Sequence, residues 1–195
     1  MGLIPETPPG ATPLDTDDLE GLIPSHIATQ GQLNEWEHAN IARAEEWAFG
    51  VRRRDILSVD FITLLHRRMF GDTWTWAGEI RRKETLPVGI APERIRVELA
   101  VLLDDLQTQI TCRSWSLPEI AARFHHRLVY IHPFPNGNGR FSRTMADLLL
   151  FRDGHERFVW GAHLERHGEV RSRYIAALQA ADRKDYRPLF ELLRL

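Results

Sequence analysis

The chain is organised around the stretch His132-Pro-Phe-Pro-Asn-Gly-Asn-Gly-Arg140-Phe-Ser-Arg143. Its two prolines cannot continue a helix, and the glycines on either side of Asn138 can adopt positive φ angles that turn backbone N–H groups inward as an anion-binding nest. After Gly139 the pattern becomes helical, so this nest lies at a helix N-terminus, where the helix dipole also favours negative charge. The stretch therefore predicts a phosphate-binding loop between two helices.

Three ionisable side chains complete this loop. Arg140 and Arg143 lie three residues apart on the following helix, near enough on one face to reach a single polyphosphate. His132 ends the preceding helical segment and can exchange a proton near neutral pH. The helix C-terminus favours the protonated ring and the two arginines oppose it, so the sequence leaves the pKa of His132 open. The stretch thus combines a base with a phosphate-binding loop.

The composition narrows the class of protein. The 195 residues, 43% of them hydrophobic, suffice for one core. No run approaches the roughly 18 apolar residues of a membrane span and no signal peptide is recognised, so we expect a cytoplasmic protein without a membrane partner. The single cysteine, Cys112, excludes an internal disulfide framework. A formal net charge of −2 gives no reason to expect a nucleic-acid partner.

Helical periodicity on both sides of the loop predicts an all-α domain. Ser116-Leu-Pro-Glu119 is a capping box that starts the helix ending at His132. Between residues 74 and 91 the helical period fails, and glycine, proline and β-tolerant residues indicate a loop or small hairpin. The other predicted helices span residues 15–21, 33–47, 58–71, 92–110, 140–154 and 165–181, with a short one after Pro188.

The run Phe124-His-x-x-Leu128-x-x-Ile131, followed by the loop, resembles the signature of Fic-domain proteins. Two later stretches, Tyr174-x-x-Ala177-Leu178 and Asp185-Tyr-Arg-Pro-Leu189, are similar to the closing helices of that family. The resemblance covers residues 55–195, and it is closest to the small bacterial group labelled mobile mystery protein B. It implies the Fic fold, an all-α helical bundle with a small β-hairpin flap.

The resemblance also implies how the chain is divided. Residues 1–30 would form an N-terminal arm and residues 31–195 the Fic-type helical domain, with the flap at about 80–90 and the catalytic loop at 132–140. In Fic proteins the flap docks the target protein by adding its strand to an exposed edge. The basic residues Arg81 to Lys83 would then assist docking.

The activity implied by the resemblance is AMPylation, the transfer of AMP from ATP to a hydroxyl side chain of a target protein with release of pyrophosphate. His132 would deprotonate a serine, threonine or tyrosine hydroxyl, which would attack the α-phosphorus, and Phe134 would anchor the loop in the core. Such a transfer depends mainly on positioning and charge stabilisation. A homodimer is one assembly that the sequence leaves open. The implied phosphate-binding residues are Gly137, Asn138, Gly139, Arg140 and Arg143.

Asn136 departs from the Fic pattern. Fic proteins usually carry Asp or Glu at this position, where the carboxylate ligates the magnesium ion that bridges the nucleotide phosphates. An asparagine carbonyl can still ligate a hard cation but brings no charge, so we expect Mg²⁺ to be held more weakly. Either Asn136 suffices with help from phosphate oxygens and water, or the protein is slow, differently specific or inactive.

A second motif lies near the N-terminus. Thr16-Asp-Asp-Leu-Glu20-Gly21 matches the inhibitory motif of the family, which is Ser or Thr, three residues, Glu, then Gly or Asn. In self-inhibited members the glutamate contacts the second arginine of the loop motif, here Arg143, and blocks productive binding of the γ-phosphate. The resemblance therefore implies self-inhibition by Glu20, whereas the residues alone also allow an acidic helix start without a role.

Three functions remain open from the sequence. The first is a self-inhibited AMP transferase that acts on a protein hydroxyl. The second is another reaction on the same fold, either removal of AMP, with Glu20 orienting water, or transfer of a different phosphate-linked group. The third is a nucleotide-binding regulatory module with weak or no catalysis, which Asn136 permits.

Overall fold

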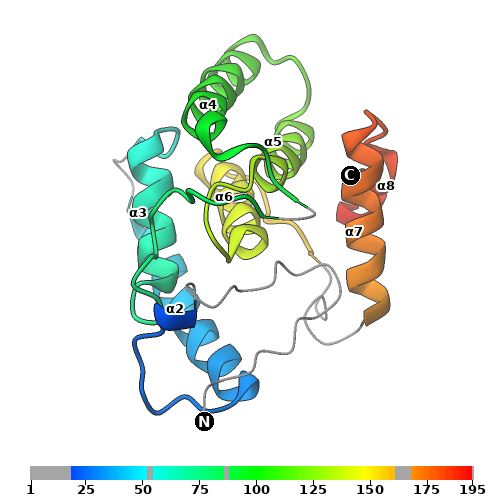
Figure 1. The fold of residues 1–195 in the computed structure, drawn as a ribbon. Coiled ribbons are helices and arrows are strands. Elements are labelled where there is room, and N and C mark those ends of the chain that lie inside the picture. Colours follow the sequence, from blue (N-terminus) through cyan, green and yellow to red (C-terminus); the bar gives the residue numbers. More distant parts are fainter. Residues whose placement is uncertain (1–18, 52–54, 86–87, 161–167, 195) are drawn as a thin grey trace.

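The structure, a computed structural model, describes residues 19–51, 55–85, 88–160 and 168–194. These residues are mainly helical, and they contain no β-strand beyond an isolated antiparallel bridge between Leu22 and Trp74. The all-α prediction is therefore confirmed, and the helices predicted from residue 33 onward all occur (Figure 1). The helical elements are α2 (Gln30–Gly50), α3 (Val59–Phe70), η1 (Pro92–Arg94), α4 (Ile95–Cys112), α5 (Leu117–Ile131), α6 (Asn138–Arg152), α7 (Gly168–Asp182) and α8 (Arg187–Leu193).

Side-chain caps fix where several helices begin. The Ser58 and Ser116 side chains accept hydrogen bonds from the N–H groups of Phe61 and Glu119, as an N-cap serine should. Thr29 forms a full capping box with Gln32, so α2 begins three residues earlier than its apolar pattern predicts. None of the helices in the described ranges is both long enough and apolar enough to cross a membrane.

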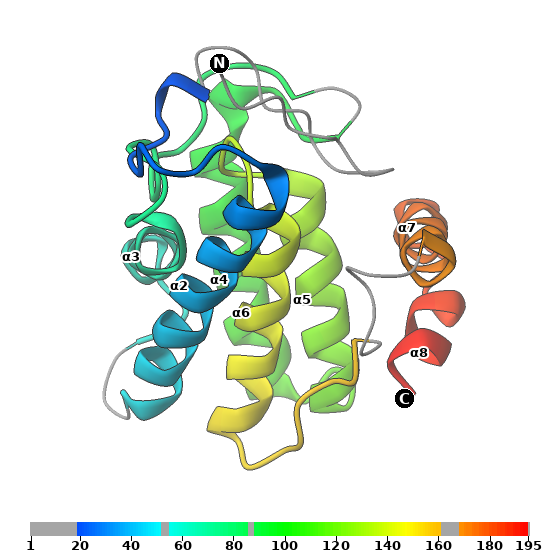
Figure 2. The ribbon, with the colours of Figure 1, turned by 90° about the horizontal axis from the view of Figure 1, so that it is seen from below.

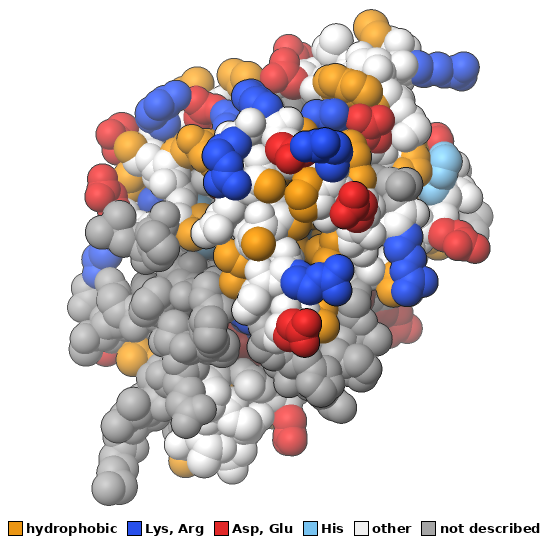
Figure 3. Space-filling model, turned by 90° about the vertical axis from the view of Figure 1, so that its right-hand side faces the viewer, with side chains coloured by type: hydrophobic (Ala, Val, Ile, Leu, Met, Phe, Trp, Pro, Cys, Tyr) orange, Lys and Arg blue, Asp and Glu red, His pale blue; other side chains and the backbone are white. Residues whose placement is uncertain are grey.

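The helices α5 and α6 lie side by side at the centre of the bundle, joined by the loop (Figure 2). On one side α6 packs against α2 and α3, while α4 packs against α5, and α7 and α8 form a pair beside α5. The inward faces of these helices make the core, where Leu65, Leu128 and Phe141 are fully buried. The side of the molecule that α7 and α8 present carries basic, acidic and apolar side chains intermixed (Figure 3). The central α5–α6 pair therefore holds the loop at one end of the bundle.

The segment predicted as a flap is an extended loop rather than a hairpin ladder among its described residues. The Arg81 side chain lies between its two arms, because its Nη1 donates to Lys83 O at 2.8 Å and its Nη2 donates to Ile90 O. At the tip, Thr85 Oγ1 donates to Val88 O at 2.7 Å. A guanidinium thus binds the carbonyl groups that a second strand would otherwise pair. Arg81 is only 4% exposed, so the prediction that it forms a basic docking surface is wrong.

Candidate active site

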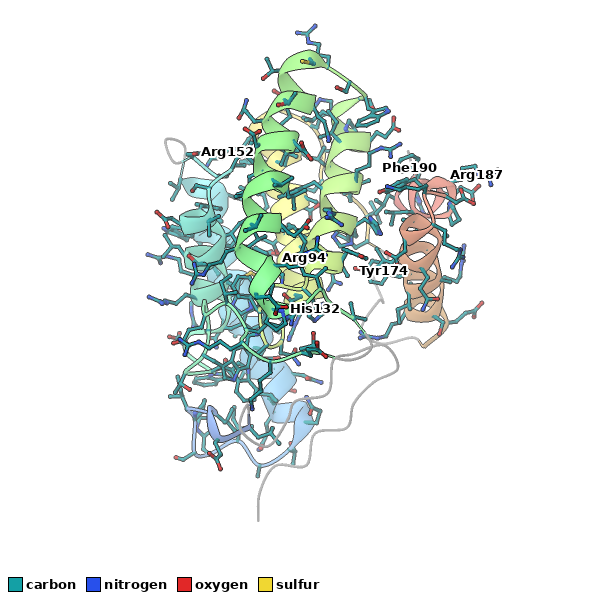
Figure 4. The ribbon with its side chains drawn as sticks, turned by 45° about the horizontal axis from the view of Figure 1, so that its top comes forward. Arg94, His132, Arg152, Tyr174, Arg187 and Phe190 are labelled. Atoms are coloured by element: carbon teal, nitrogen blue, oxygen red, sulfur yellow. The ribbon has the colours of Figure 1, made fainter. Side chains whose placement is uncertain are left out.

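His132 lies where α5 ends and the loop begins, at one end of the helix bundle (Figure 4). Its backbone has φ 54° and ψ 62°, the left-handed conformation, which turns the chain sharply out of the helix. For a residue with a Cβ this conformation costs about 1–2 kcal/mol. The strain is offset by Arg81, whose Nε donates to His132 O at 2.6 Å, and by the backbone bond from Arg81 N to Pro133 O at 2.9 Å.

The His132 side chain has the protonation state of a base. His132 Nδ1 lies 3.3 Å from Val129 O. Because a carbonyl can only accept a hydrogen bond, the neutral ring carries its proton on Nδ1. Nε2 is then the basic nitrogen. Burial, and secondarily the charge of Arg81, lowers the pKa of His132 from 6.5 to about 4, although the bond to Val129 opposes the shift. The ring is therefore neutral at pH 7.

The turn after Asn136 requires glycine. Gly137 has φ 77°, and a Cβ at this position would lie 2.6 Å from the ring of Phe70. The chain then enters α6, whose first intrahelical bond runs from Phe141 N to Gly137 O at 2.9 Å. The preceding N–H groups of the first helical turn, from Asn138 onward, have no acceptor within the helix, and this arrangement favours anion binding.

The Asn138 side chain has a structural role inside the loop. Its Oδ1 accepts from Phe134 N at 3.0 Å and its Nδ2 donates to Phe134 O at 2.8 Å, so the amide bridges the two ends of the turn. Asn138 is 2% exposed. Only its backbone N–H is thus available to a phosphate, and the side chain keeps the loop closed.

Phe134 anchors the loop in the core through a residue that sequence reasoning missed. The Phe134 ring is fully buried and stacks on His66 with ring centroids 3.7 Å apart. His66 Nδ1 accepts from Gly78 N at 3.0 Å, so Nε2 carries the proton and donates to Asn136 O at 3.0 Å. Burial lowers the pKa of His66 to about 3, which keeps this neutral tautomer. His66 therefore ties α3, the base of the flap and the loop together.

Asn136 offers limited means of holding a metal ion. Its Oδ1 accepts a hydrogen bond from Gly137 N at 2.7 Å, so the amide folds back onto the loop. The described residues contain no group of three or more His, Cys, Asp or Glu side chains that could hold a metal ion. One neutral oxygen does not make a magnesium site by itself, because Mg²⁺ is usually bound through carboxylates together with substrate phosphates.

The two arginines of the motif contact different parts of the protein. Arg140 Nη1 donates to Glu37 Oε2 on α2 at 2.6 Å, and Arg140 Cζ lies 4.9 Å from the centroid of the Phe70 ring. Arg143 hydrogen-bonds the hydroxyl of Tyr174 on α7, and its Nη1 lies 3.8 Å from the Cβ position of Gly139. Both guanidinium groups are thus beside the loop, on its two sides.

Tyr174 supports Arg143 from the side of α7 that faces the bundle (Figure 4). Its hydroxyl lies 2.9 Å from His125 Nε2 on α5. Burial raises the pKa of Tyr174, and burial followed by the charge of Arg143 lowers the pKa of His125 to about 3. Both rings are therefore neutral at pH 7, and each feels the positive charge of Arg143.

The predicted inhibitory residues are only partly described. Thr16 falls outside the described residues, and Glu20 is exposed. Gly21 is buried, since its Cβ position lies 2.7 Å from the Trp76 ring, and its carbonyl accepts from Thr75 N at 2.9 Å. Gly21 and Leu22 are thus docked on residues 73–76, and the contact between Glu20 and Arg143 stays a prediction.

Comparison with known proteins places this geometry in a family. Residues 56–150 match the model of the Fic/DOC family. The protein adenylyltransferase fic-1 of Caenorhabditis briggsae is 34% identical over 137 residues, which cover 68% of this chain and 25% of that protein. The protein adenylyltransferase Fic of Aedes aegypti is 30% identical over 147 residues, which cover 73% of this chain and 28% of that protein. The chain therefore spans about a quarter of the length of the curated relatives it matches.

Solved structures agree with the sequence comparison. Fic-1 from Caenorhabditis elegans is 29% identical, with a TM-score of 0.62, and the match covers 80% of this chain and 45% of that one. BepC from Bartonella tribocorum, solved with bound AMPPNP, is 19% identical, with a TM-score of 0.69. The match covers 92% of this chain and 96% of that one, and it shows the shared fold. Through residues 56–150, which carry His132, the loop and Arg143, this chain belongs to the Fic/DOC family.

Proposed function

We propose that this chain is a protein adenylyltransferase that moves AMP from ATP to a protein hydroxyl. The observation that carries the proposal is the neutral His132, with Nε2 as its basic nitrogen, at the end of a loop that leads into the N-terminus of α6. Nε2 would take the proton of the target hydroxyl while the hydroxyl oxygen attacks the α-phosphorus. The bond between the α-phosphorus and the bridging oxygen breaks, and pyrophosphate leaves with that oxygen.

The phosphates would be held by the first turn of α6 and the two arginines. The backbone N–H groups of Asn138 and Gly139 would bind phosphate oxygens, and that of Gly137 would join them by exchanging its bond to Asn136 Oδ1 for one to a phosphate. Arg140 and Arg143 would bind the β- and γ-phosphates. The position of Arg143 Nη1 beside Gly139 supports this assignment. Mg²⁺ would neutralise charge on the phosphates, and with the neutral Asn136 beside it the ion would depend mainly on phosphate and water ligands.

The target protein would bind along the flap. Gly89 lies against His132, with its Cβ position 3.1 Å from His132 Cβ, so a segment bound to the flap would bring its hydroxyl near the base. The extended arms of the flap suit pairing with a peptide strand. We assign a serine, threonine or tyrosine hydroxyl as the acceptor because a neutral imidazole can accept its proton.

Self-inhibition by the N-terminal segment is part of this proposal. Gly21 and Leu22 dock on residues 73–76. The ring centroids of Trp76 and His66 are 6.3 Å apart, and His66 supports the loop. Glu20 directly precedes this docked segment in the chain, and Thr16 lies four residues before Glu20. We expect Glu20 to oppose productive binding of the γ-phosphate.

The second candidate function is a nucleotide-binding regulatory module without catalysis. The observation in its favour is Asn136, which replaces a charged metal ligand with an amide that already accepts from Gly137 N–H. This candidate predicts nucleotide binding without any transfer of AMP.

Labelling with radioactive ATP and Mg²⁺ separates the two candidates. Glu20→Gly should label itself or an added lysate more strongly than wild type, and Glu20→Gly combined with His132→Ala should lose the label while still binding ATP. Unlabelled protein in every variant, with ATP binding retained, would support the regulatory module. Equal labelling of wild type and Glu20→Gly would refute self-inhibition but not the transferase.

A further inference from the structure

Arg140 is held by a buried acid that belongs to neither the loop nor the motif. Glu37 lies on α2 and its side chain is only 7% exposed. Its Oε2 accepts from Arg140 Nη1 at 2.6 Å, and its Oε1 accepts from Trp74 Nε1 at 2.7 Å. Both carboxylate oxygens therefore have donors, and the donors come from two different segments of the chain.

The guanidinium that Glu37 holds lies next to the loop. The Phe70 ring is 4.9 Å from Arg140 Cζ, and the same ring is 2.6 Å from the Cβ position of Gly137. Phe70 is 1% exposed and cannot move without disturbing the core. Glu37 on one side and Phe70 beneath thus fix the plane of the guanidinium beside the turn that leads into α6.

We propose that Glu37 is a positioning residue, which orients Arg140 so that its remaining N–H donors face the phosphates of the nucleotide. This inference rests on the proposed role of Arg140 in phosphate binding. Arginine has five donors, and the contact with Glu37 uses Nη1, so the same guanidinium can bind the carboxylate and a phosphate together.

Competition between Glu37 and the nucleotide for Arg140 is the opposite reading of the same contact. It would require the nucleotide to draw Arg140 away and leave a buried carboxylate with Trp74 as its remaining donor. Removing one partner of a buried ion pair is strongly unfavourable, because the other charge stays buried and uncompensated. The ion pair therefore persists when nucleotide binds, and Glu37 supports binding rather than opposing it.

Glu37→Gln tests the proposal because glutamine keeps the shape and an acceptor for Trp74 but loses the charge. The test measures binding of ATP and of AMP by calorimetry, without Mg²⁺ or turnover. We expect Glu37→Gln to bind ATP about tenfold more weakly, since a charge-assisted hydrogen bond no longer orients Arg140. AMP affinity should stay within about twofold of wild type, because AMP lacks the phosphates assigned to Arg140.

Glu45→Gln is the matched control, since Glu45 lies on the same helix, accepts from Thr144 Oγ1 of α6 at 2.9 Å and forms no ion pair with an arginine of the described ranges. It should bind ATP as wild type does. Arg140→Gln should also bind ATP weakly, and adding Glu37→Gln to it should cause no further loss. If Glu37→Gln folds poorly, Glu37→Asp serves as a second variant. It keeps the charge and should bind ATP more tightly than Glu37→Gln.

Unchanged or tighter ATP binding by Glu37→Gln, or equal weakening of ATP and AMP, would overturn the proposal. The measurement does not depend on AMP transfer. If ATP binding responds as expected but no variant ever labels protein, the positioning role stands and the proposed transferase activity fails.

Discussion

Arg81 Nε donates to the backbone carbonyl of His132 at 2.6 Å, so one buried guanidinium joins the flap to the proposed base. The same side chain binds the carbonyl groups of Lys83 and Ile90 on the two arms of the flap. The conformation of His132 and the order of the flap are thus linked through a single residue.

Replacing Arg81 should loosen both the flap and the loop. Arg81→Met keeps much of the apolar stem but removes every donor, and it should lower the free energy of unfolding by about 2–4 kcal/mol, because several carbonyl groups lose a charged donor. Denaturant unfolding measures this loss, and hydrogen exchange at residues 83–90 should speed up. Arg82→Met, at a residue that is exposed, is the control and should change the stability by less than about 0.5 kcal/mol. Unchanged exchange in the flap of Arg81→Met would contradict the link.

Gly137→Ala should cost more than an ordinary substitution in the left-handed region. Gly137 and Gly154 have the same φ of 77°, but a Cβ meets Phe70 at 2.6 Å at position 137 and nothing within 4 Å at position 154. Gly154→Ala should therefore show only the conformational cost of about 1–2 kcal/mol. Gly137→Ala should add an overpacking cost of about 1–3 kcal/mol and lose ATP binding. Thermal unfolding and calorimetry measure both effects, and equal losses in the two variants would refute the role of the close contact.

Stability should fall as the pH drops below 6.5, because burial lowers the pKa of several histidines, three of them by a large amount. Burial lowers the pKa of His66 and His125 to about 3 and that of His132 to about 4. The unfolded chain, with histidine pKa values near 6.5, binds these protons first, so the stabilisation is complete above pH 6.5. It is lost from pH 6.5 down to about 4 for His132 and down to about 3 for His66 and His125. Within its window, each histidine lowers the free energy of unfolding by about 1.4 kcal/mol for each pH unit of acidification.

Denaturant unfolding at pH 7 and pH 5 checks this slope. His132→Asn, which has no titrating ring, should show a shallower dependence on pH than the wild type. A free energy of unfolding that does not change between these two pH values would contradict the neutral, buried state of the three rings.

Asn136→Asp should strengthen the use of magnesium. The substitution restores a carboxylate at the position where the wild-type amide accepts from Gly137 N–H, and the added charge favours a hard divalent cation. Half-maximal labelling should require at least several-fold less Mg²⁺ than in the wild type, as measured by titration at fixed ATP. The same magnesium dependence in both proteins would contradict the claim that the neutral Asn136 weakens magnesium binding.

The sequence predicted local features well. The cap at Ser116 and the glycine turn at Gly137 depend on residues close together in the chain, so short patterns reveal them. The early start of α2 was missed because the capping pair Thr29 and Gln32 precedes the apolar repeat on which the prediction was based.

The supporting residues of the site could not be read from such patterns. His66, Arg81 and Glu37 lie on α3, on the flap and on α2, and each acts through contacts 50 or more residues away in the chain. Arg81 resembled one member of an exposed basic cluster, and Glu37 resembled a polar residue of an amphipathic helix. Only the packing of α2 and the flap against the loop identifies them as buried partners.

The most direct test of AMP transfer compares ATP labelled at the α-phosphorus with ATP labelled at the γ-phosphorus, using Glu20→Gly and the same protein carrying His132→Ala. The proposed reaction predicts protein label from the α-position only, and loss of that label without His132. Label from the γ-position, or α-label that survives His132→Ala, would contradict adenylyl transfer with His132 as the base.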